Sequence, residues 1–229
     1  MVLARASFPI WVLPALLVAF TSFVVVAVKI GRWRDAKRYA ALTGVAKQLG
    51  MHFTPHDISI LSQWGGFALS PQGSFPQVTS VMRGTRGAPV IVFDLAQSVG
   101  TDKSKSWMQR TIAAFDVSAT PLPVFVGEGI GSSRFQRFLE KVLGGKAIDF
   151  PDDAEFSRGY KVRGQNPDTI RRVFSADARA HLMRRGNWQF RSTGNWLLLA
   201  SIGDRPKPEE FGAFLDEASD CVRLMTRVP

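Results

Sequence analysis

The sequence predicts an α+β fold, with one transmembrane helix near the amino terminus followed by a single cytoplasmic domain of hairpins, an antiparallel sheet and packed helices. Three observations predict this class. Residues 6–28 are apolar and uncharged, glycine-containing turns join two pairs of strands, and apolar stripes at helical spacing occur without a regular βαβ rhythm. We therefore expect an anchor with a basic flank over residues 1–39 and a domain over residues 40–229.

The uncharged run from Ala6 to Val28 contains 23 residues, which cover roughly 34 Å as a helix, against about 30 Å of bilayer hydrocarbon. Charged residues follow the run where a signal peptide would have a cleavage site, so a retained anchor is favoured over a cleaved leader. Pro14 is expected to kink the helix or to mark its effective start, and Gly31 is the expected hinge.

Basic residues gather directly after the run, whereas Arg5 is the one basic side chain before it. The positive-inside bias therefore predicts a short amino-terminal tail outside a bacterial inner membrane and the carboxyl-terminal domain in the cytoplasm. Anionic lipid headgroups are a second candidate contact for the same side chains. These membrane-flanking residues are Lys29, Arg32, Arg34, Lys37 and Arg38.

Apolar spacing predicts the remaining elements. The first helix is expected to continue as an amphipathic helix over 40–50, with Leu42, Val45, Ala46 and Leu49 on one stripe. Two hairpins are predicted, one turning at residues 84–87 and one at 193–195. The further strands expected are 108–117, 122–126 and 160–162, and the further helices expected begin near Ser133, Asn166, Ser175 and Pro208.

Composition narrows the class of protein. The chain has 45% hydrophobic and 21% charged residues, which excludes a disordered protein. One cysteine excludes a disulfide framework, and three histidines without a tight pair offer little for a metal site. Cys221 lies in an apolar helical stripe and is expected to be a buried, inert thiol. The sequence assigns no catalytic, cofactor-binding or metal-binding residue, and it favours a non-enzymatic role without excluding an enzyme.

Two short motifs are open to a ligand-binding interpretation. Gly127–Gly131 lies between a predicted strand and a helix, but it lacks the residues of a phosphate loop, so a turn into a capped helix is favoured over nucleotide binding. Asp149–Glu155 carries four carboxylates that suit a hard cation or acid–base catalysis. A solvated turn, or pairing with nearby arginines, is the favoured use of those carboxylates.

Residues 158–191 are strongly basic, with nine Lys or Arg against two Asp. Such a surface suits anionic lipid, an acidic protein or nucleic acid, and nucleic acid is excluded from our prediction because no binding module is visible. A solvated basic face without a partner is the alternative. Four residues in or beside two short predicted helices are the interface candidates, namely Arg171, Arg172, Arg184 and Arg185.

The chain resembles a family of uncharacterised bacterial single-span membrane proteins. The resemblance rests on segments 92–94, 122–125, 149–151, 156–164 and 171–175 and covers most of residues 36–225. It implies a membrane-anchored cytoplasmic α+β domain, and it implies no activity or catalytic residues.

The resulting hypothesis is a non-enzymatic accessory subunit of a multi-subunit bacterial membrane complex. Its span would dock laterally on integral membrane subunits, and its domain would brace its neighbours. Photosynthetic reaction-centre, respiratory and secretion complexes all fit this architecture. The alternatives are a tethered adaptor for an acidic cytosolic partner and a membrane-anchored enzyme of unknown chemistry.

Overall fold

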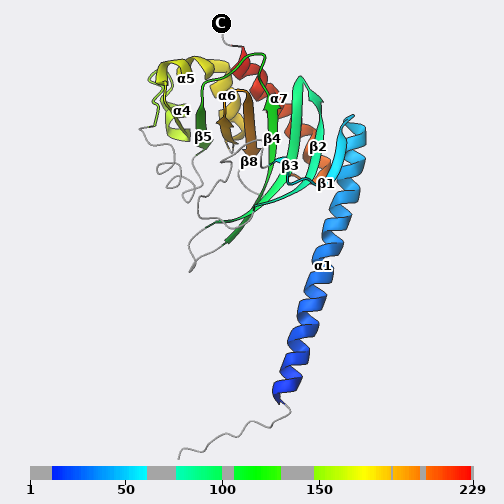
Figure 1. Cartoon of the computed structure of the whole chain (residues 1–229). Coiled ribbons are helices and arrows are strands. Elements are labelled where there is room, and N and C mark those ends of the chain that lie inside the picture. Colours follow the sequence, from blue (N-terminus) through cyan, green and yellow to red (C-terminus); the bar gives the residue numbers. More distant parts are fainter. Residues whose placement is uncertain are drawn as a thin grey trace, which may run out of the picture. The chain divides into compact units, whose positions relative to one another are not determined.

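A computed structural model describes residues 12–60, 76–99, 106–129, 147–186, 188–201 and 205–227 (Figure 1). The chain divides into two compact units, Met1–Ala41 and Leu42–Pro229. The predicted α+β class is confirmed, since a long apolar helix precedes an antiparallel sheet with packed helices. The helix predicted to begin near Ser133 lies outside the described residues.

Helix α1 runs from Val12 to Gln48 without interruption. The expected hinge at Gly31 is wrong, because this residue lies within the helix. A glycine costs a helix about 1 kcal/mol relative to alanine, which the flanking helix-forming residues are able to offset. The predicted stripe at the end of α1 is confirmed: Leu42 and Ala46 are buried, and Val45 and Leu49 pack against the same core.

In the described part of the chain, eight strands form one sheet and each of their pairings is antiparallel. Their order across the sheet is β1-β2-β3-β4-β8-β7-β5-β6, so segments distant in sequence lie side by side. The strands are β1 (His52–His56), β2 (Gln77–Arg86), β3 (Ala88–Val99), β4 (Ser106–Asp116), β5 (Phe125–Gly129), β6 (Tyr160–Gly164), β7 (Trp188–Ser192) and β8 (Trp196–Ser201).

Both predicted hairpins are present, but the first turns more tightly than expected. Residues 84–86 continue β2, and the chain reverses at Gly87, where Arg86 pairs with Ala88. Gly87 has a φ of 71°, a left-handed conformation that glycine adopts without a Cβ clash. The second hairpin joins β7 to β8 through residues 193–195, as predicted.

Side-chain caps define the shorter helices. Asp153, Asn166 and Ser175 each accept a backbone N–H at the start of a helix, and the left-handed Gly186 ends the third helix. The helix starts at Asn166 and Ser175 were predicted. The described helices that follow β5 are α4 (Ala154–Gly159), α5 (Pro167–Val173), α6 (Ala176–Arg185), the 3-10 turn η1 (Pro208–Glu210) and α7 (Phe211–Thr226).

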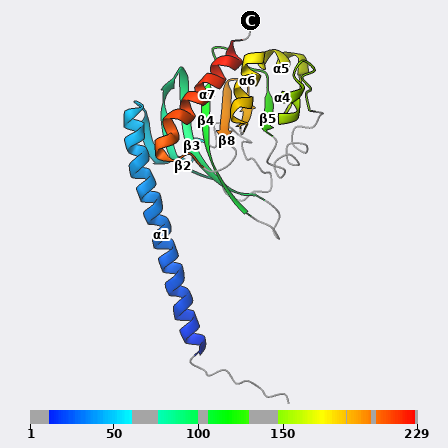
Figure 2. The ribbon, with the colours of Figure 1, turned by 180° about the vertical axis from the view of Figure 1, so that it is seen from behind.

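The main hydrophobic core lies between one face of the sheet and the helices, and α7 crosses that face (Figure 2). The predicted α7 stripe is confirmed, since its apolar residues are buried in this core. Phenylalanine rings from several elements meet beside it, with Phe125, Phe150, Phe156 and Phe190 all within 6.0 Å, centroid to centroid, of the Phe174 ring. This aromatic cluster packs α4 and the carboxyl-terminal end of α5 against β5 and β7.

The opposite face of the sheet carries a second buried cluster, built by the alternate residues of the same strands. Phe93, Ile112 and Leu198 belong to it and are each at most 2% exposed. The continuous apolar run of residues 90–93 in β3 therefore has buried side chains on both faces of the sheet.

Candidate functional site

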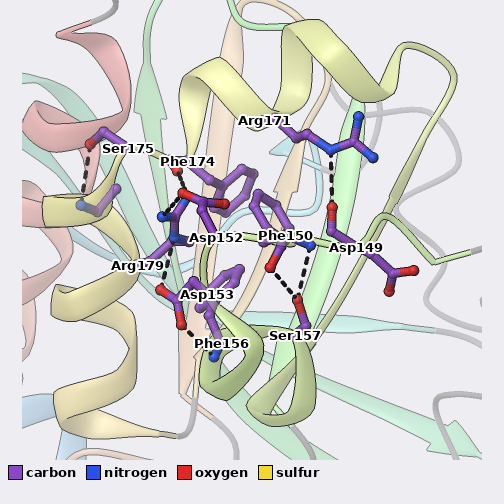
Figure 3. A network of polar contacts seen from close by, with 11 residues as sticks. Asp149, Phe150, Asp152, Asp153, Phe156, Ser157, Arg171, Phe174, Ser175 and Arg179 are labelled. Carbon is purple, nitrogen blue, oxygen red and sulfur yellow. Dashed lines mark hydrogen bonds and ion pairs between the residues drawn. The ribbon is translucent and has the colours of Figure 1, made fainter.

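The acidic segment and the arginine-rich helices lie against each other, and Arg179 of α6 is the centre of their contact (Figure 3). Its Nη2 lies 2.6 Å from Asp152 Oδ2, and its Nε lies 2.9 Å from Asp153 Oδ2. The third guanidinium nitrogen, Nη1, donates to the Phe174 carbonyl at 2.9 Å. The guanidinium carbon lies 5.5 Å from the centre of the Phe150 ring. With only 7% of its side chain exposed, Arg179 is a structural cation.

Two carboxylates of this segment, those of Asp152 and Asp153, therefore serve folding. Asp153 accepts the Phe156 N–H at 2.9 Å with one oxygen, which caps α4, and it pairs with Arg179 through the other. The hydrogen bond from Arg179 lowers the pKa of Asp152. Within the described ranges, no group of three or more His, Cys, Asp or Glu side chains is placed to hold a metal ion. Of the uses considered from the sequence, pairing with arginine is the one that the contacts favour.

The interface candidates on α5 make different contacts from Arg179. Arg171 donates through Nε to the Asp149 carbonyl at 2.9 Å, and its Nη1 lies 2.8 Å from Asp168 Oδ1. The Arg171 side chain is nevertheless 40% exposed. Arg172 is exposed and donates to Thr169 Oγ1 at 3.3 Å, which is a neutral partner in the same helix. Arg172 thus remains suited to an external anion.

Arg184 of α6 is exposed and donates through Nη2 to His181 Nδ1 at 2.9 Å. Because an arginine only donates, His181 Nδ1 must accept, and its Nε2–H donates to the Glu217 carbonyl of α7 at 3.0 Å. Burial, followed by the charge of Arg184, lowers the pKa of His181. The side chain of the fourth candidate, Arg185, lies outside the described part of the structure.

Residues 147–186, which include the acidic segment, carry a smaller excess of positive charge than residues 158–191 alone. Residues 147–186, which build α4, β6, α5 and α6, include eight Lys or Arg and six Asp or Glu. The acidic segment folds onto the arginines that follow it, as Figure 3 shows. A uniformly basic face is therefore not formed, and any interface here consists of individual exposed arginines.

The basic flank of the anchor lies in α1. Lys37 Nζ lies 5.5 Å from the centre of the Trp33 ring, and 64% of the Trp33 surface is exposed. An indole ring beside a lysine is typical of a helix that leaves a membrane, where the ring lies among headgroups and the ammonium reaches water. Of the other flank residues, Lys29 and Arg34 are exposed and Arg38 is half-buried, whereas the Arg32 side chain is outside the described set.

The glycine-rich motif was predicted to be a turn, and this prediction is wrong for its described part. Gly127, Glu128 and Gly129 belong to β5; Gly127 and Glu128 pair with both β6 and β7, and Gly129 pairs with β6. A Cβ on Gly127 would lie 2.0 Å from the Phe190 ring, and one on Gly129 would lie 2.5 Å from the Gly186 carbonyl oxygen. These glycines permit close packing inside a sheet, and they form no phosphate loop. Residues 130 and 131 lie outside the described residues.

Cys221 is fully buried, and burial raises its pKa to about 12. The thiol is therefore protonated at neutral pH and is a poor nucleophile, in agreement with the expectation of an inert core residue.

The structure also brings together polar groups that sequence reasoning missed. Arg110 of β4 donates through Nη1 to the side-chain oxygen of Gln189 on β7, and both side chains are buried. Asp94 of β3 is 2% exposed, accepts a hydrogen bond from Thr111 at 2.6 Å and lies 3.4 Å from Arg205. The sequence identifies these buried polar positions by a charged residue within an apolar strand, as at Asp94 and Arg110.

No protein-family model, curated protein or solved structure matches this chain. The resemblance to bacterial single-span proteins therefore remains an expectation.

Proposed function

We propose that the protein is a non-enzymatic accessory subunit of a multi-subunit bacterial integral membrane complex. The proposal rests on one observation, which is that apolar side chains are exposed on all sides of α1. Leu16, Leu17, Val18, Phe20 and Phe23 are 62% to 71% exposed, and at 100° per residue they point to different sides of the helix. A helix that is apolar all round belongs in lipid or against other spans.

A polar residue within this apolar stretch is satisfied by the helix itself. Thr21 Oγ1 donates to the Leu17 carbonyl at 2.8 Å and lies 3.0 Å from that of Val18. Internal hydrogen bonding of this kind is what a hydroxyl needs in a hydrocarbon environment. α1 is long and apolar enough to cross a membrane. A leader sequence, or a core helix of a soluble protein, meets the same criteria of length and composition. The exposure of its apolar side chains argues against a core helix.

The basic flank supports an orientation with the domain in the cytoplasm of a bacterial inner membrane. Five Lys or Arg follow Val28, against the single Asp35 in the same stretch. Positive side chains close to a span are retained on the cytoplasmic side. Contact of this flank with anionic headgroups would add to the anchoring.

The domain would then brace neighbouring subunits through exposed arginines. Arg171, Arg172 and Arg184 reach the surface from α5 and α6, and each presents a fork of donors suited to carboxylates. Because Arg179 and Asp153 already fix these helices internally, the outer arginines are supported on a rigid base. Photosynthetic reaction-centre, respiratory and secretion complexes are the classes of assembly that fit.

Purification of the full chain in a mild detergent, with identification of co-purifying chains, tests this function. A stoichiometric integral membrane partner is expected. Recovery of only a soluble acidic protein would favour a tethered adaptor, and a protein that purifies alone would overturn the accessory-subunit proposal.

A variant of the domain distinguishes association through its arginines from association through the membrane span. Changing Arg171, Arg172, Arg184 and Arg185 to Gln is expected to reduce recovery of the partner while leaving the melting temperature nearly unchanged. Unaltered recovery over a range of salt concentrations would assign the association to the span alone.

A further inference from the structure

His181 connects α6 to α7 and forms hydrogen bonds with both of its ring nitrogens. The residue is 8% exposed, and its Nε2 donates to the Glu217 carbonyl of α7 at 3.0 Å. Its Nδ1 accepts a hydrogen bond from Arg184 Nη2 at 2.9 Å, about one turn later on α6. A ring that donates through one nitrogen and accepts through the other is neutral, because a protonated imidazole only donates. The contacts therefore define the neutral form of His181.

Arg184 depends on this acceptor for its position. Its side chain is exposed near the end of α6, and within the described residues its hydrogen bond is the one to His181. That bond uses one N–H of the guanidinium, which leaves its other donors for an acceptor outside the chain. The buried ring thus holds an exposed guanidinium in a defined position.

Protonation of His181 would remove this support. The proton would be taken up at Nδ1, because Nε2 already carries one, and two N–H donors would then face each other at 2.9 Å. Both groups would also be positively charged and would repel. The Nε2–H bond to the Glu217 carbonyl is kept in the protonated form, so the ring stays in place. The exposed Arg184 side chain is therefore the one that moves.

The groups around the ring oppose protonation at neutral pH. Burial is the largest cause that lowers the pKa of His181, and the charge of Arg184 is the second. From α7, Arg223 acts in the same direction and Asp220 in the opposite one. His181 is therefore neutral at pH 7 and takes up its proton below its ordinary value of 6.5. The contact with Arg184 is complete at neutral pH and is lost on acidification.

We propose that His181 is a pH-sensitive latch that fixes Arg184 for partner binding at neutral pH and releases it on acidification. This inference rests on the proposed function, in which Arg184 contacts a carboxylate of a neighbouring subunit. A guanidinium that is fixed before contact loses less rotamer freedom on binding than a mobile one, so the closed latch strengthens association. By linkage, a partner that binds the fixed Arg184 lowers the affinity of His181 for its proton.

Titration of the histidine rings by NMR tests the latch without any partner. The full-length protein in detergent, labelled with ¹³C at histidine Cε1, has three such rings, and H181Q identifies the signal of His181. We expect R184Q to raise the pKa of His181 more than R223Q does, because Arg184 is the larger cause and bonds the ring directly. R223Q removes the same charge and is the matched control. An unchanged titration in R184Q, or an equal rise in both variants, would overturn the latch.

Recovery of the co-purifying partner between about pH 7.5 and pH 5.5 tests the coupling to association. In the unaltered protein, recovery should fall at least about fivefold over this range, the lower end of typical couplings between sites. H181Q does not titrate, so its recovery should be independent of pH. R184Q lacks the latched side chain and should lose the same pH dependence, which keeps the test valid if H181Q does not fold.

The two measurements distinguish failure of the latch from failure of the proposed function. An equal pH dependence of recovery in the unaltered protein, H181Q and R184Q would overturn the coupling to association. A partner that is absent at every pH would overturn the proposed function and the coupling with it, whereas the ring titration decides the contact between His181 and Arg184 in either case.

Discussion

Arg179 and Asp153 form an ion pair of 2.9 Å that connects two helices through one carboxylate. The same Asp153 side chain caps α4 by accepting the Phe156 N–H, while Arg179 belongs to α6 and also bonds the Phe174 carbonyl at the end of α5. Three short helices are thereby tied together by two side chains. Each is at most ten residues long and depends on such contacts, since isolated helices of this length are marginal in water.

Replacing Arg179 with Gln should therefore destabilise the domain. The change leaves the Phe174 carbonyl and two carboxylates without their donor, and hydrogen bonds to charged groups contribute about 1.5–3 kcal/mol to stability. Urea unfolding followed by circular dichroism measures the loss. R172Q on the exposed face of α5 is the control and should stay within about 0.5 kcal/mol of the unaltered protein. Equal stability of the two variants would contradict a structural role for Arg179.

Truncation of the Phe214 side chain to Ala should cost about 2–5 kcal/mol of unfolding free energy, because it leaves a cavity in the main core. Phe214 is 1% exposed, and its ring stacks on that of Trp188 with 5.6 Å between centroids. L215A should behave similarly, since Leu215 is also 1% exposed. The matched control is A213S at an exposed position of α7, where little change is expected. A loss below about 1 kcal/mol in both core variants would argue against this packing.

A chain that begins at Ala40 should fold without the anchor, since it retains every described residue of the main core. Removal of ten further residues, to begin at Gly50, should abolish or sharply weaken the cooperative melt, because Leu42 and Ala46 are 0% and 1% exposed in that core. Scanning calorimetry of the two truncated chains makes the comparison. Indistinguishable melts would show that the end of α1 adds nothing to the fold, and no melt in the longer chain would mean that a partner completes the core.

Stability should depend on pH through His181. Its pKa is lowered on folding from an ordinary value of 6.5, so the unfolded chain takes up the proton first as the pH falls. This contribution is complete above about pH 7 and is lost as the pH falls through 6.5 and then through the folded pKa. The groups that face the ring are Arg184, Asp220 and Arg223.

Urea midpoints measured between about pH 5 and pH 7.5 test this dependence, with H181Q as the comparison because glutamine does not titrate. The slope of stability against pH should be smaller in the variant. An identical slope would assign the dependence to other groups.

A reporter fused after Pro229 should be active in the cytoplasm, because the five basic residues that follow Val28 are held on that side. Replacing Lys29, Arg32, Arg34, Lys37 and Arg38 by Gln should scramble insertion while the melt of the domain stays unchanged. Reporter activity in the periplasm would reverse the proposed orientation.

The sequence by itself determined the local structure. Asn166 and Ser175 cap the helices that they were predicted to cap, and α7 buries the stripe read from its spacing. Each signal lies within one or two helical turns, a range over which side chains and backbone act directly on one another. Strand β1 was missed because it is short and contains Pro55, which no alternating pattern marks as a strand.

Only the tertiary structure decided which strands pair and which charges meet. Strand β5 lies between β6 and β7. Its residues pair with residues more than thirty positions later in β6 and more than fifty positions later in β7, and these pairings place Val126 between Arg163 and Arg191. Arg179 likewise pairs with Asp152, 27 residues earlier. Contacts over such separations depend on loop closure and on the packing of whole elements, because no periodicity within a single segment specifies them.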